Sequence, residues 1–150
     1  MRIAIGNDHR GYQLKGRLLV LLADAGHEVE NVGSDSDERV DYPDFASLVG
    51  ELVRQKKVDR GILICGSGIG MCIAANKVVG VRAANCSDEV GAEMSRRHND
   101  ANVLCLSADM LGEGAVNRIV NTWLRTDFEG GRHQRRVDKI IESETSTGDR

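Results

Sequence analysis

Apolar positions along this chain follow two spacings that alternate from the first residues to about residue 124. Short apolar runs predict strands at 2–6, 27–32, 58–65, 81–86 and 103–106. Apolar residues that recur every three or four positions predict helices at 14–22, 44–57, 71–77, 88–98 and 113–124. Because strand and helix alternate, the pattern predicts an α/β fold with a doubly wound, Rossmann-like parallel sheet of five strands between two layers of helices.

The third predicted strand, 58–65, is the most apolar segment of the chain and shows no polar alternation. This is typical of a strand that is covered on both faces. Ligands in such sheets bind at the carboxyl ends of the strands, near the point where the strand order reverses. Asp8 and His9 follow the first strand and Cys65 ends the third, so we expect these side chains to meet. His98 precedes the fifth strand and would join them only as the end of its helix or across a subunit boundary.

Composition limits the function classes. A chain of 150 residues suffices for one core, and with 3% aromatic residues that core must be aliphatic. A formal net charge of −3 argues against nucleic acid or an anionic membrane as a partner. No segment reaches the roughly 18 consecutive apolar residues of a membrane span, and no signal peptide precedes the first strand, so we expect a cytoplasmic protein. The cysteines and histidines show no metal-ligand spacing, so we expect no metal.

We expect one domain over residues 1–141, which includes a C-terminal arm from about residue 126. Gly130 and Gly131 interrupt the chain there, and the arginines of 132–136 concentrate positive charge before an apolar stripe. Such a group of arginines suits a small anion. Residues 142–150 are polar, and we expect them to form a frayed tail.

Gly66, Gly68 and Gly70 form a GxGxG run between the buried strand and the following helix. The free amides of such a loop, together with the helix N-terminus, form a concavity that binds anions. The run is not a dinucleotide fingerprint, because Met71 stands where that motif needs glycine. It also lacks the Gly-Lys-Ser/Thr of a Walker A loop. A tight turn without a ligand is the alternative interpretation of this segment.

Cys65 ends the strand directly before these amides, which favour the thiolate form of its side chain. A thiolate beside backbone N–H donors can act as a nucleophile, or as a general base whose oxyanion product the amides stabilise. His98, followed by Asn99, can imitate the oriented imidazole that covalent hydrolysis requires. The residues alone therefore leave both chemistries open.

Six motifs occur in order over residues 1–141: Asp8-His9, Asp41-Tyr42-Pro43, GILICGSGIG at 61–70, IAANK at 73–77, HNDANVL at 98–104 and GGRH at 130–133. Together they resemble the ribose-5-phosphate isomerase type B family, whose wider group also contains galactose-6-phosphate and allose-6-phosphate isomerases. The resemblance implies an aldose–ketose isomerase of the pentose phosphate pathway that interconverts ribose 5-phosphate and ribulose 5-phosphate through an enediolate, without metal or cofactor. It also implies a homodimer, able to pair into a tetramer, with two active sites across the dimer interface.

By this resemblance, Cys65 is the base that moves a proton between C1 and C2 of the sugar, and Ser67 with the loop amides stabilises the enediolate oxygens. His98 protonates the ring oxygen to open the furanose, and Asp8 assists at the sugar hydroxyls. The residues expected to bind substrate are His9, Tyr42, Gly66, Gly68, Ile69, Gly70, Asn99, Arg132 and Arg136. Of these, His9 and the two arginines hold the phosphate, and the arginines reach the site from the partner's tail.

Two positions distinguish this chain within the family it resembles. Some members use a glutamate just after the glycine loop as the base, but Met71 occupies that place here, so the chain resembles the cysteine version. Many members carry a phosphate-binding arginine where Asp109 stands here. A carboxylate there repels phosphate, so either Arg135 or another basic group compensates, or the substrate is allose 6-phosphate, galactose 6-phosphate or a free aldose. A non-catalytic sugar-phosphate-binding module is a second alternative.

Overall fold

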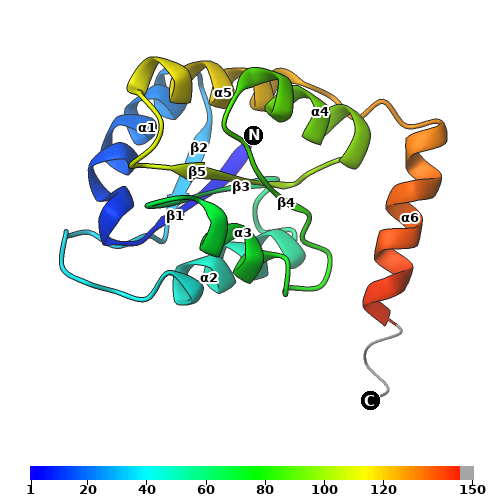
Figure 1. The fold of residues 1–150 in the computed structure, drawn as a ribbon, viewed down its shortest axis with the longest axis horizontal. Helices are drawn as coiled ribbons and strands as arrows, with labels where there is room; N and C mark the ends of the chain where they lie inside the picture. Colours follow the sequence, from blue (N-terminus) through cyan, green and yellow to red (C-terminus); the bar gives the residue numbers. More distant parts are fainter. Residues whose placement is uncertain (146–150) are drawn as a thin grey trace.

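The computed structural model describes residues 1–145 and contains one sheet of five strands in the order β2-β1-β3-β5-β4 (Figure 1). The strands are β1 (Arg2–Asn7), β2 (Glu28–Asn31), β3 (Arg60–Cys65), β4 (Ala83–Asn85) and β5 (Val103–Ser107). Every neighbouring pair is parallel, so the predicted α/β parallel sheet is confirmed. The chain leaves β1 toward β2 and leaves β3 toward the opposite side of the sheet, which creates a switch point between these two central strands.

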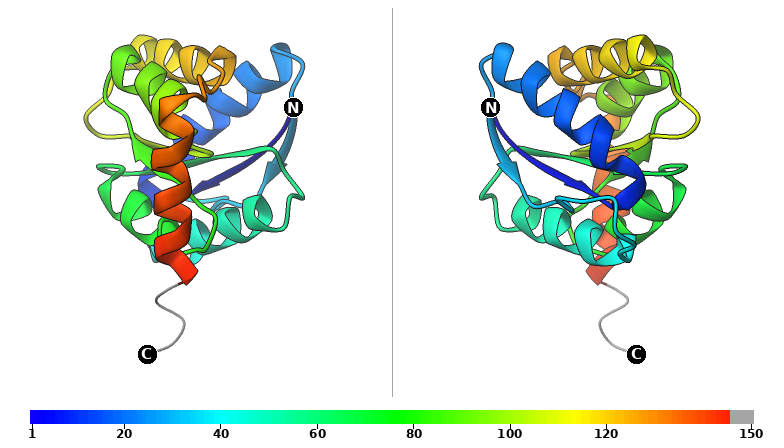
Figure 2. Two further views of the ribbon diagram at one scale, coloured as in Figure 1. Left: turned by 90° about the vertical axis from the view of Figure 1, so that its right-hand side faces the viewer. Right: turned by 90° about the vertical axis from the view of Figure 1, so that its left-hand side faces the viewer.

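Helices cover both faces of the sheet and give the predicted three layers, as the side views show (Figure 2). One face is covered by α1 (Tyr12–Asp24), α4 (Glu89–Asn99) and α5 (Glu113–Arg125). The other face is covered by α2 (Tyr42–Arg54) and α3 (Ile69–Ala75). A single 3-10 turn, η1 (His9–Gly11), lies between β1 and α1.

Successive side chains of a strand point to opposite faces, so each central strand contributes to two cores. On one face, Ile64 of β3 packs in a cluster with Leu18 of α1 and Trp123 of α5. On the other face, Leu63 packs in a cluster with Val49 of α2. All residues of β3 are buried, which confirms the prediction of a strand covered on both faces. The two clusters hold the strand ends, and the loops that follow them, in fixed positions.

Three boundaries differ from the predicted ones for reasons that lie in the backbone. The second helix begins at Tyr42, because Pro43 fits the first turn of a helix, where its missing N–H has no partner to lose. The third helix begins at Ile69, because Gly68 has a φ of 77° and turns the chain directly into the helix. The strand predicted at 81–86 is shorter, since only Ala83–Asn85 pair with β5.

The C-terminal arm is helix α6 (Arg132–Thr145), which stands beside the β4 edge of the sheet, outside the helical layers (Figures 1 and 2). Val137 is buried, and the carboxylate of Glu144 accepts the backbone N–H of Gly80 at 3.0 Å. Residues 142–145 therefore continue the helix where the sequence pattern favours a frayed tail, and 146–150 lie outside the described residues. None of the helices within residues 1–145 has both the length and the apolar character needed to cross a membrane.

Candidate active site

The carboxyl ends of β1 and β3 place Asp8 and Cys65 at the same edge of the sheet. The backbone N–H of Asp8 donates to the carbonyl of Ile64 at 3.1 Å, which ties the end of β1 to β3. Asp8 is 5% exposed, and its Oδ1 accepts the backbone N–H groups of Arg10 at 2.9 Å and Gly11 at 3.3 Å. The carboxylate is thereby fixed at the start of η1, beside the end of β3, where the strand pattern predicts it.

Cys65 faces the glycine loop. Its Sγ accepts the backbone N–H of Gly68 at 3.2 Å, and the residue is 5% exposed. An N–H directed at sulfur stabilises negative charge on it. Gly68 can adopt the required φ of 77° without strain, and a Cβ there would lie 2.5 Å from Oδ1 of Asn85. The loop thus requires glycine at this position and directs a backbone donor at the thiol.

Ser67, Ile69 and Gly70 complete the wall of the loop. The Oγ of Ser67 accepts the backbone N–H of Ile69 at 3.2 Å, which holds the hydroxyl at the start of α3. The ring of Tyr42 packs against Gly70 so closely that a Cβ on the glycine would lie 2.6 Å from the ring. Since Tyr42 is also exposed, it lies over the loop on the solvent side.

A salt bridge between Arg10 and Asp109 covers Gly66. The Nη2 and Nε of Arg10 both donate to Oδ2 of Asp109, at 2.6 and 3.1 Å, and a Cβ on Gly66 would lie 2.8 Å from the same oxygen. The hydrogen bond that Arg10 donates to Asp109 raises the pKa of Arg10. Sequence reasoning leaves open which basic group compensates for Asp109, and the structure pairs it with Arg10, not Arg135. Arg10 was detectable in the sequence as the residue that directly follows the Asp-His motif.

His9 and Arg10 line a pocket of about 370 Å³ beside this salt bridge. The Nδ1 of His9 accepts the backbone N–H of Val40 at 3.4 Å, which orients the imidazole. Arg17 and Asp37 line the same pocket. The pocket therefore combines an imidazole and two guanidinium groups with the carboxylates of Asp37 and Asp109, beside the salt bridge that covers Gly66.

His98 and Asn99 lie at the opposite edge of the sheet. Cys65 is paired in register with Ser107, the last residue of β5, whereas α4 ends just before β5 begins. A parallel sheet separates these two positions by the full length of the strand. Within one chain, His98 and Asn99 therefore do not meet Cys65, and the end of the preceding helix does not bring them there.

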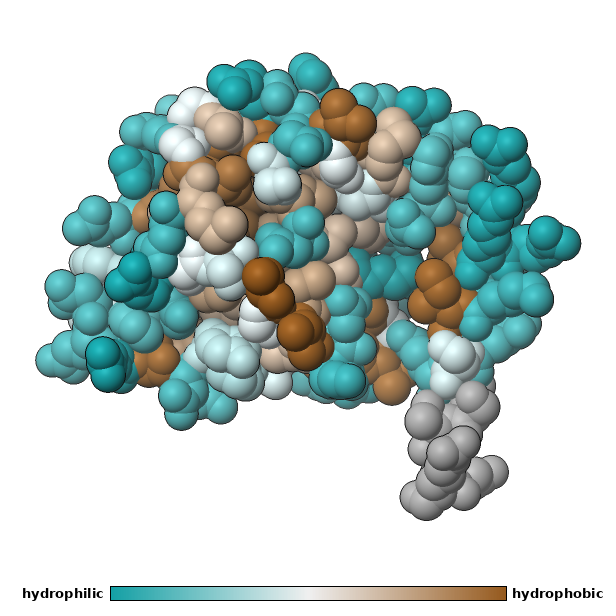
Figure 3. Space-filling model, in the orientation of Figure 1, coloured by the Kyte–Doolittle hydropathy of each residue, from teal (hydrophilic) through white to brown (hydrophobic). Residues whose placement is uncertain are grey.

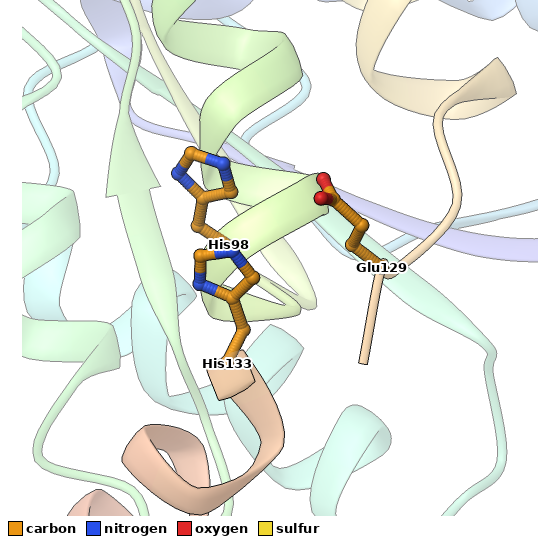
Figure 4. Close-up of side chains that lie close together, drawn as sticks. All are labelled: His98, Glu129 and His133. Carbon is orange, nitrogen blue, oxygen red and sulfur yellow. The ribbon is translucent and has the colours of Figure 1, made fainter. Parts of the chain in front are cut away.

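His98 stacks on His133 of α6, with ring centroids 4.2 Å apart and 11° between the ring planes (Figure 4). His133 is 4% exposed, and its Nε2 has no hydrogen-bond partner among residues 1–145. Burial, and then the charges of His98 and Arg132, lower the pKa of His133. Arg132 and Arg136 are exposed on the same helix. The structure thus groups His98 with the predicted arginines, and it adds His133, which is not among the predicted site residues.

Glu129 joins the two imidazoles in a group whose possible metal-ligand atoms lie within 4.8 Å of one another (Figure 4). The sequence spacing of these residues does not indicate such a group. Two features disfavour a metal centre in this arrangement. The lone pairs of nearly parallel imidazoles lie in parallel planes and do not converge on one point, and the Glu129 carboxylate accepts the Nε–H of Arg97 at 2.9 Å. The group is best described as a stacked histidine pair with an acidic neighbour.

The other cysteines lie in different surroundings. Burial raises the pKa of Cys86 to about 11 and that of Cys105 well above its ordinary value. Cys72 is half-buried, and a hydrogen bond with Cys105 lowers its pKa to about 7. Its thiol donates to the carbonyl of Ala83 at 3.4 Å. Among the four cysteines, Cys65 is the one whose sulfur accepts an N–H from the glycine loop.

Known proteins resemble this chain over nearly its whole length. A family profile described as Ribose/Galactose Isomerase matches residues 3–140. Ribose-5-phosphate isomerase B of Escherichia coli (strain K12) is 48% identical over 139 residues, which cover 93% of each chain. A structure of ribose-5-phosphate isomerase B from Clostridium thermocellum has a TM-score of 0.97 at 49% identity and covers 99% of this chain and 100% of that one. A Mycoplasma genitalium structure with bound ribulose-5-phosphate has a TM-score of 0.93 at 46% identity, over 96% of each chain.

Proposed function

The chain belongs to the ribose/galactose isomerase family, and from this premise we propose that it interconverts ribose 5-phosphate and ribulose 5-phosphate. The observation that carries the proposal is the hydrogen bond from Gly68 to the sulfur of Cys65, at the switch point and beside Asp8. A thiolate in that setting can accept a proton from carbon while the loop amides face the oxygens that become negative. The Mycoplasma genitalium relative, whose structure holds ribulose-5-phosphate, supports the choice of sugar.

In the proposed reaction, the sulfur of Cys65 removes the proton from C2 of the open-chain aldose, and the electron pair forms the C1–C2 double bond of an enediolate. Ser67 and the loop amides stabilise the negative charge on oxygen. A proton passes from O2 to O1, and Cys65 returns its proton to C1, which gives the ketose. Asp8 orients the sugar hydroxyls. Protons move only among protein and substrate atoms, so the scheme requires neither metal nor cofactor.

The proposed active enzyme is a homodimer, because within one chain His98 and Asn99 lie at the edge of the sheet opposite Cys65. In this arrangement His98 of a second copy protonates the ring oxygen and Asn99 of that copy binds the sugar. Arg132 and Arg136 of the second copy bind the phosphate together with His9 of the first. The loop residues Gly66, Gly68, Ile69 and Gly70 and the ring of Tyr42 contact the sugar from the first copy.

Exposed apolar side chains support a second copy as the partner. Ile69 and Ile73 of α3 are 54% and 59% exposed, and further exposed apolar residues are Val79, Val90, Ile140 and Ile141. Figure 3 shows apolar surface gathered over α3 and beside α6 on one face of the molecule. A grouping of this kind is typical of a protein–protein interface. As part of the same proposal, dimers can pair into a tetramer, and the enzyme works in the cytoplasm, in the pentose phosphate pathway.

A coupled assay over ribose 5-phosphate, allose 6-phosphate, galactose 6-phosphate and free ribose tests the proposal. Wild type converts ribose 5-phosphate most efficiently, and Cys65→Ala lowers kcat by roughly 10²–10⁴-fold, the usual contribution of a general base. Cys86→Ala, which removes another buried thiol outside the site, keeps wild-type activity. Turnover of a different sugar alone would change the substrate assignment. Binding of sugar phosphate without any turnover would make the chain a binding module, and full activity in Cys65→Ala would refute the mechanism.

A further inference from the structure

The salt bridge between Arg10 and Asp109 is held from both sides by backbone contacts of the site. The N–H of Arg10 donates to Asp8 Oδ1 at 2.9 Å, which fixes Arg10 in η1. The N–H of Asp109 donates to the carbonyl of Gly66 at 3.1 Å, which fixes Asp109 beside the glycine loop. Both partners are thus attached to the edge that carries Cys65, and the guanidinium between them has a defined place.

The guanidinium of Arg10 keeps donors free for a further acceptor. A guanidinium has about five N–H donors in a rigid plane. Nε and Nη2 both donate to the single oxygen Oδ2 of Asp109, and no other hydrogen bond of the Arg10 side chain occurs within residues 1–145. The Arg10 side chain is 56% exposed and lines the 370 Å³ pocket together with His9. The unused donors are therefore accessible to an anion in that pocket.

Positive and negative side chains both line the pocket, so an anion there needs an oriented hydrogen-bond donor and not only a net positive charge. Arg17 of the pocket is paired with Glu113, and Asp37 and Asp109 bring negative charge to the same lining. An anion gains little from a balanced set of charges, but it gains charge-assisted hydrogen bonds from a guanidinium whose plane is held in place. The carboxylate of Asp109 holds that plane, and Arg10 in turn neutralises a carboxylate that would otherwise repel the anion.

We propose that Arg10 binds the phosphate group of the substrate and that Asp109 is the positioning residue that orients it. This inference rests on the proposed function, since it assigns a phosphate contact for that reaction. The Arg10–Asp109 pair thereby determines specificity for phosphorylated over free sugars at this edge of the sheet.

The test compares Arg10→Ala, Arg10→Lys, Asp109→Ala and the double variant Arg10→Ala/Asp109→Ala. Two quantities are measured: the kcat and KM for ribose 5-phosphate, and the inhibition constant of inorganic phosphate. Arg10→Ala raises both KM and the inhibition constant roughly tenfold to hundredfold, with kcat changed far less, because a charged hydrogen bond is lost and Asp109 is left unpaired. Arg10→Lys recovers part of the affinity, since it restores the charge but not the planar fork.

The Asp109 variants separate the orientation of Arg10 by Asp109 from the effect of the negative charge of Asp109. Asp109→Ala raises the inhibition constant of phosphate by about threefold to tenfold, because Arg10 is no longer held. The double variant binds phosphate better than Arg10→Ala, because the repelling carboxylate is gone. Arg54→Ala is the matched control, since it removes an exposed arginine paired with Glu51 at the far end of α2 and leaves both constants unchanged. Circular dichroism of each variant confirms folding.

The inference and the proposed function fail in different ways. If wild type does not convert ribose 5-phosphate, the proposed function is wrong, and calorimetric titration with inorganic phosphate still measures the role of Arg10. If wild type is active and Arg10→Ala has wild-type KM and inhibition constant, the inference is wrong. If Asp109→Ala has the wild-type inhibition constant, the positioning role of Asp109 is refuted. If the double variant binds phosphate no better than Arg10→Ala, the claim that Arg10 neutralises a repelling carboxylate is refuted.

Discussion

The two edges of the sheet carry different halves of the proposed chemistry and are built in different ways. At the carboxyl-terminal edge, backbone groups dominate: the N–H of Gly68 faces the sulfur of Cys65, and Asp8 is fixed by two N–H donors. At the amino-terminal edge, side chains dominate: His98 stacks on His133, and Asn99 is exposed. The carboxyl-terminal edge holds Cys65, Asp8 and the glycine loop within one chain, whereas in the proposed dimer the groups of the amino-terminal edge act on the sugar that another copy binds.

Buried arginines make the amino-terminal edge rigid. Arg60 donates to the carbonyls of Trp123 and Leu124 at 2.8 and 3.1 Å, and Arg96 donates to that of Thr126 at 3.2 Å. Both guanidinium groups lie over the Trp123 ring, at 5.2 and 5.9 Å from its centroid. Burial, and then the charge of Arg96, lower the pKa of Arg60 to about 10. This edge therefore fixes the ends of α4 and α5, from which His98 and the arm project.

The strongest test of this difference between the two edges is complementation between two inactive variants. Cys65→Ala and His98→Gln each lower activity by roughly 100-fold or more, because each removes a proton-transfer group. If every site combines one edge from each copy, mixing equal amounts of the refolded variants restores about a quarter of wild-type activity, since half of the dimers then hold one intact site. A mixture that stays as inactive as its components would show that each chain works alone.

The second prediction concerns the exposed apolar surface of α3, which in the proposed dimer brings the edges of two copies together. Ile73→Glu splits the dimer and lowers activity about tenfold or more, because a two-fold interface buries the new charge twice. Size-exclusion chromatography with light scattering measures the mass, and the coupled assay the activity. Val20→Glu on α1 is the matched control, since Val20 is 62% exposed but lies on another helix. An Ile73→Glu variant that remains dimeric and active would move the interface elsewhere.

The third prediction contrasts two glycines. Gly70→Ala raises KM about tenfold, because its Cβ would lie 2.6 Å from the Tyr42 ring and must displace it. Gly16→Ala in α1 has nothing within 4 Å of the new Cβ and stabilises the fold by about 0.5–1 kcal/mol. Steady-state kinetics and thermal unfolding of both variants check the pair. Unchanged KM in Gly70→Ala would mean that the Tyr42 ring is not part of the site.

The smallest predicted effect is a pH dependence of stability at the amino-terminal edge. The pKa of His133 lies below its ordinary value of 6.5 in the folded chain, so the unfolded chain binds a proton more readily. The contribution of neutral His133 is fully present above pH 6.5 and is lost as the pH falls through the folded pKa. Thermal unfolding at about pH 7.5 and about pH 5.5 measures it. His133→Gln reduces the drop in Tm between these pH values, and an unchanged drop contradicts the assignment.

His27 provides the comparison for that measurement. Burial, and then the charges of the N-terminus and Arg60, lower its pKa in the same direction. His27→Gln therefore removes a separate share of the drop in Tm, and the double variant removes both shares.

The sequence by itself determined the alternation of strands and helices, the parallel sheet, and the meeting of Asp8 with Cys65 at one edge. These features follow from local periodicity and from the rule that parallel strands end together. Only the tertiary structure decided that Arg10 pairs with Asp109, that His98 stacks on His133, and that both histidines lie away from Cys65. Such contacts join residues far apart in the chain, and they depend on how helices and loops pack on the sheet, which no local pattern encodes.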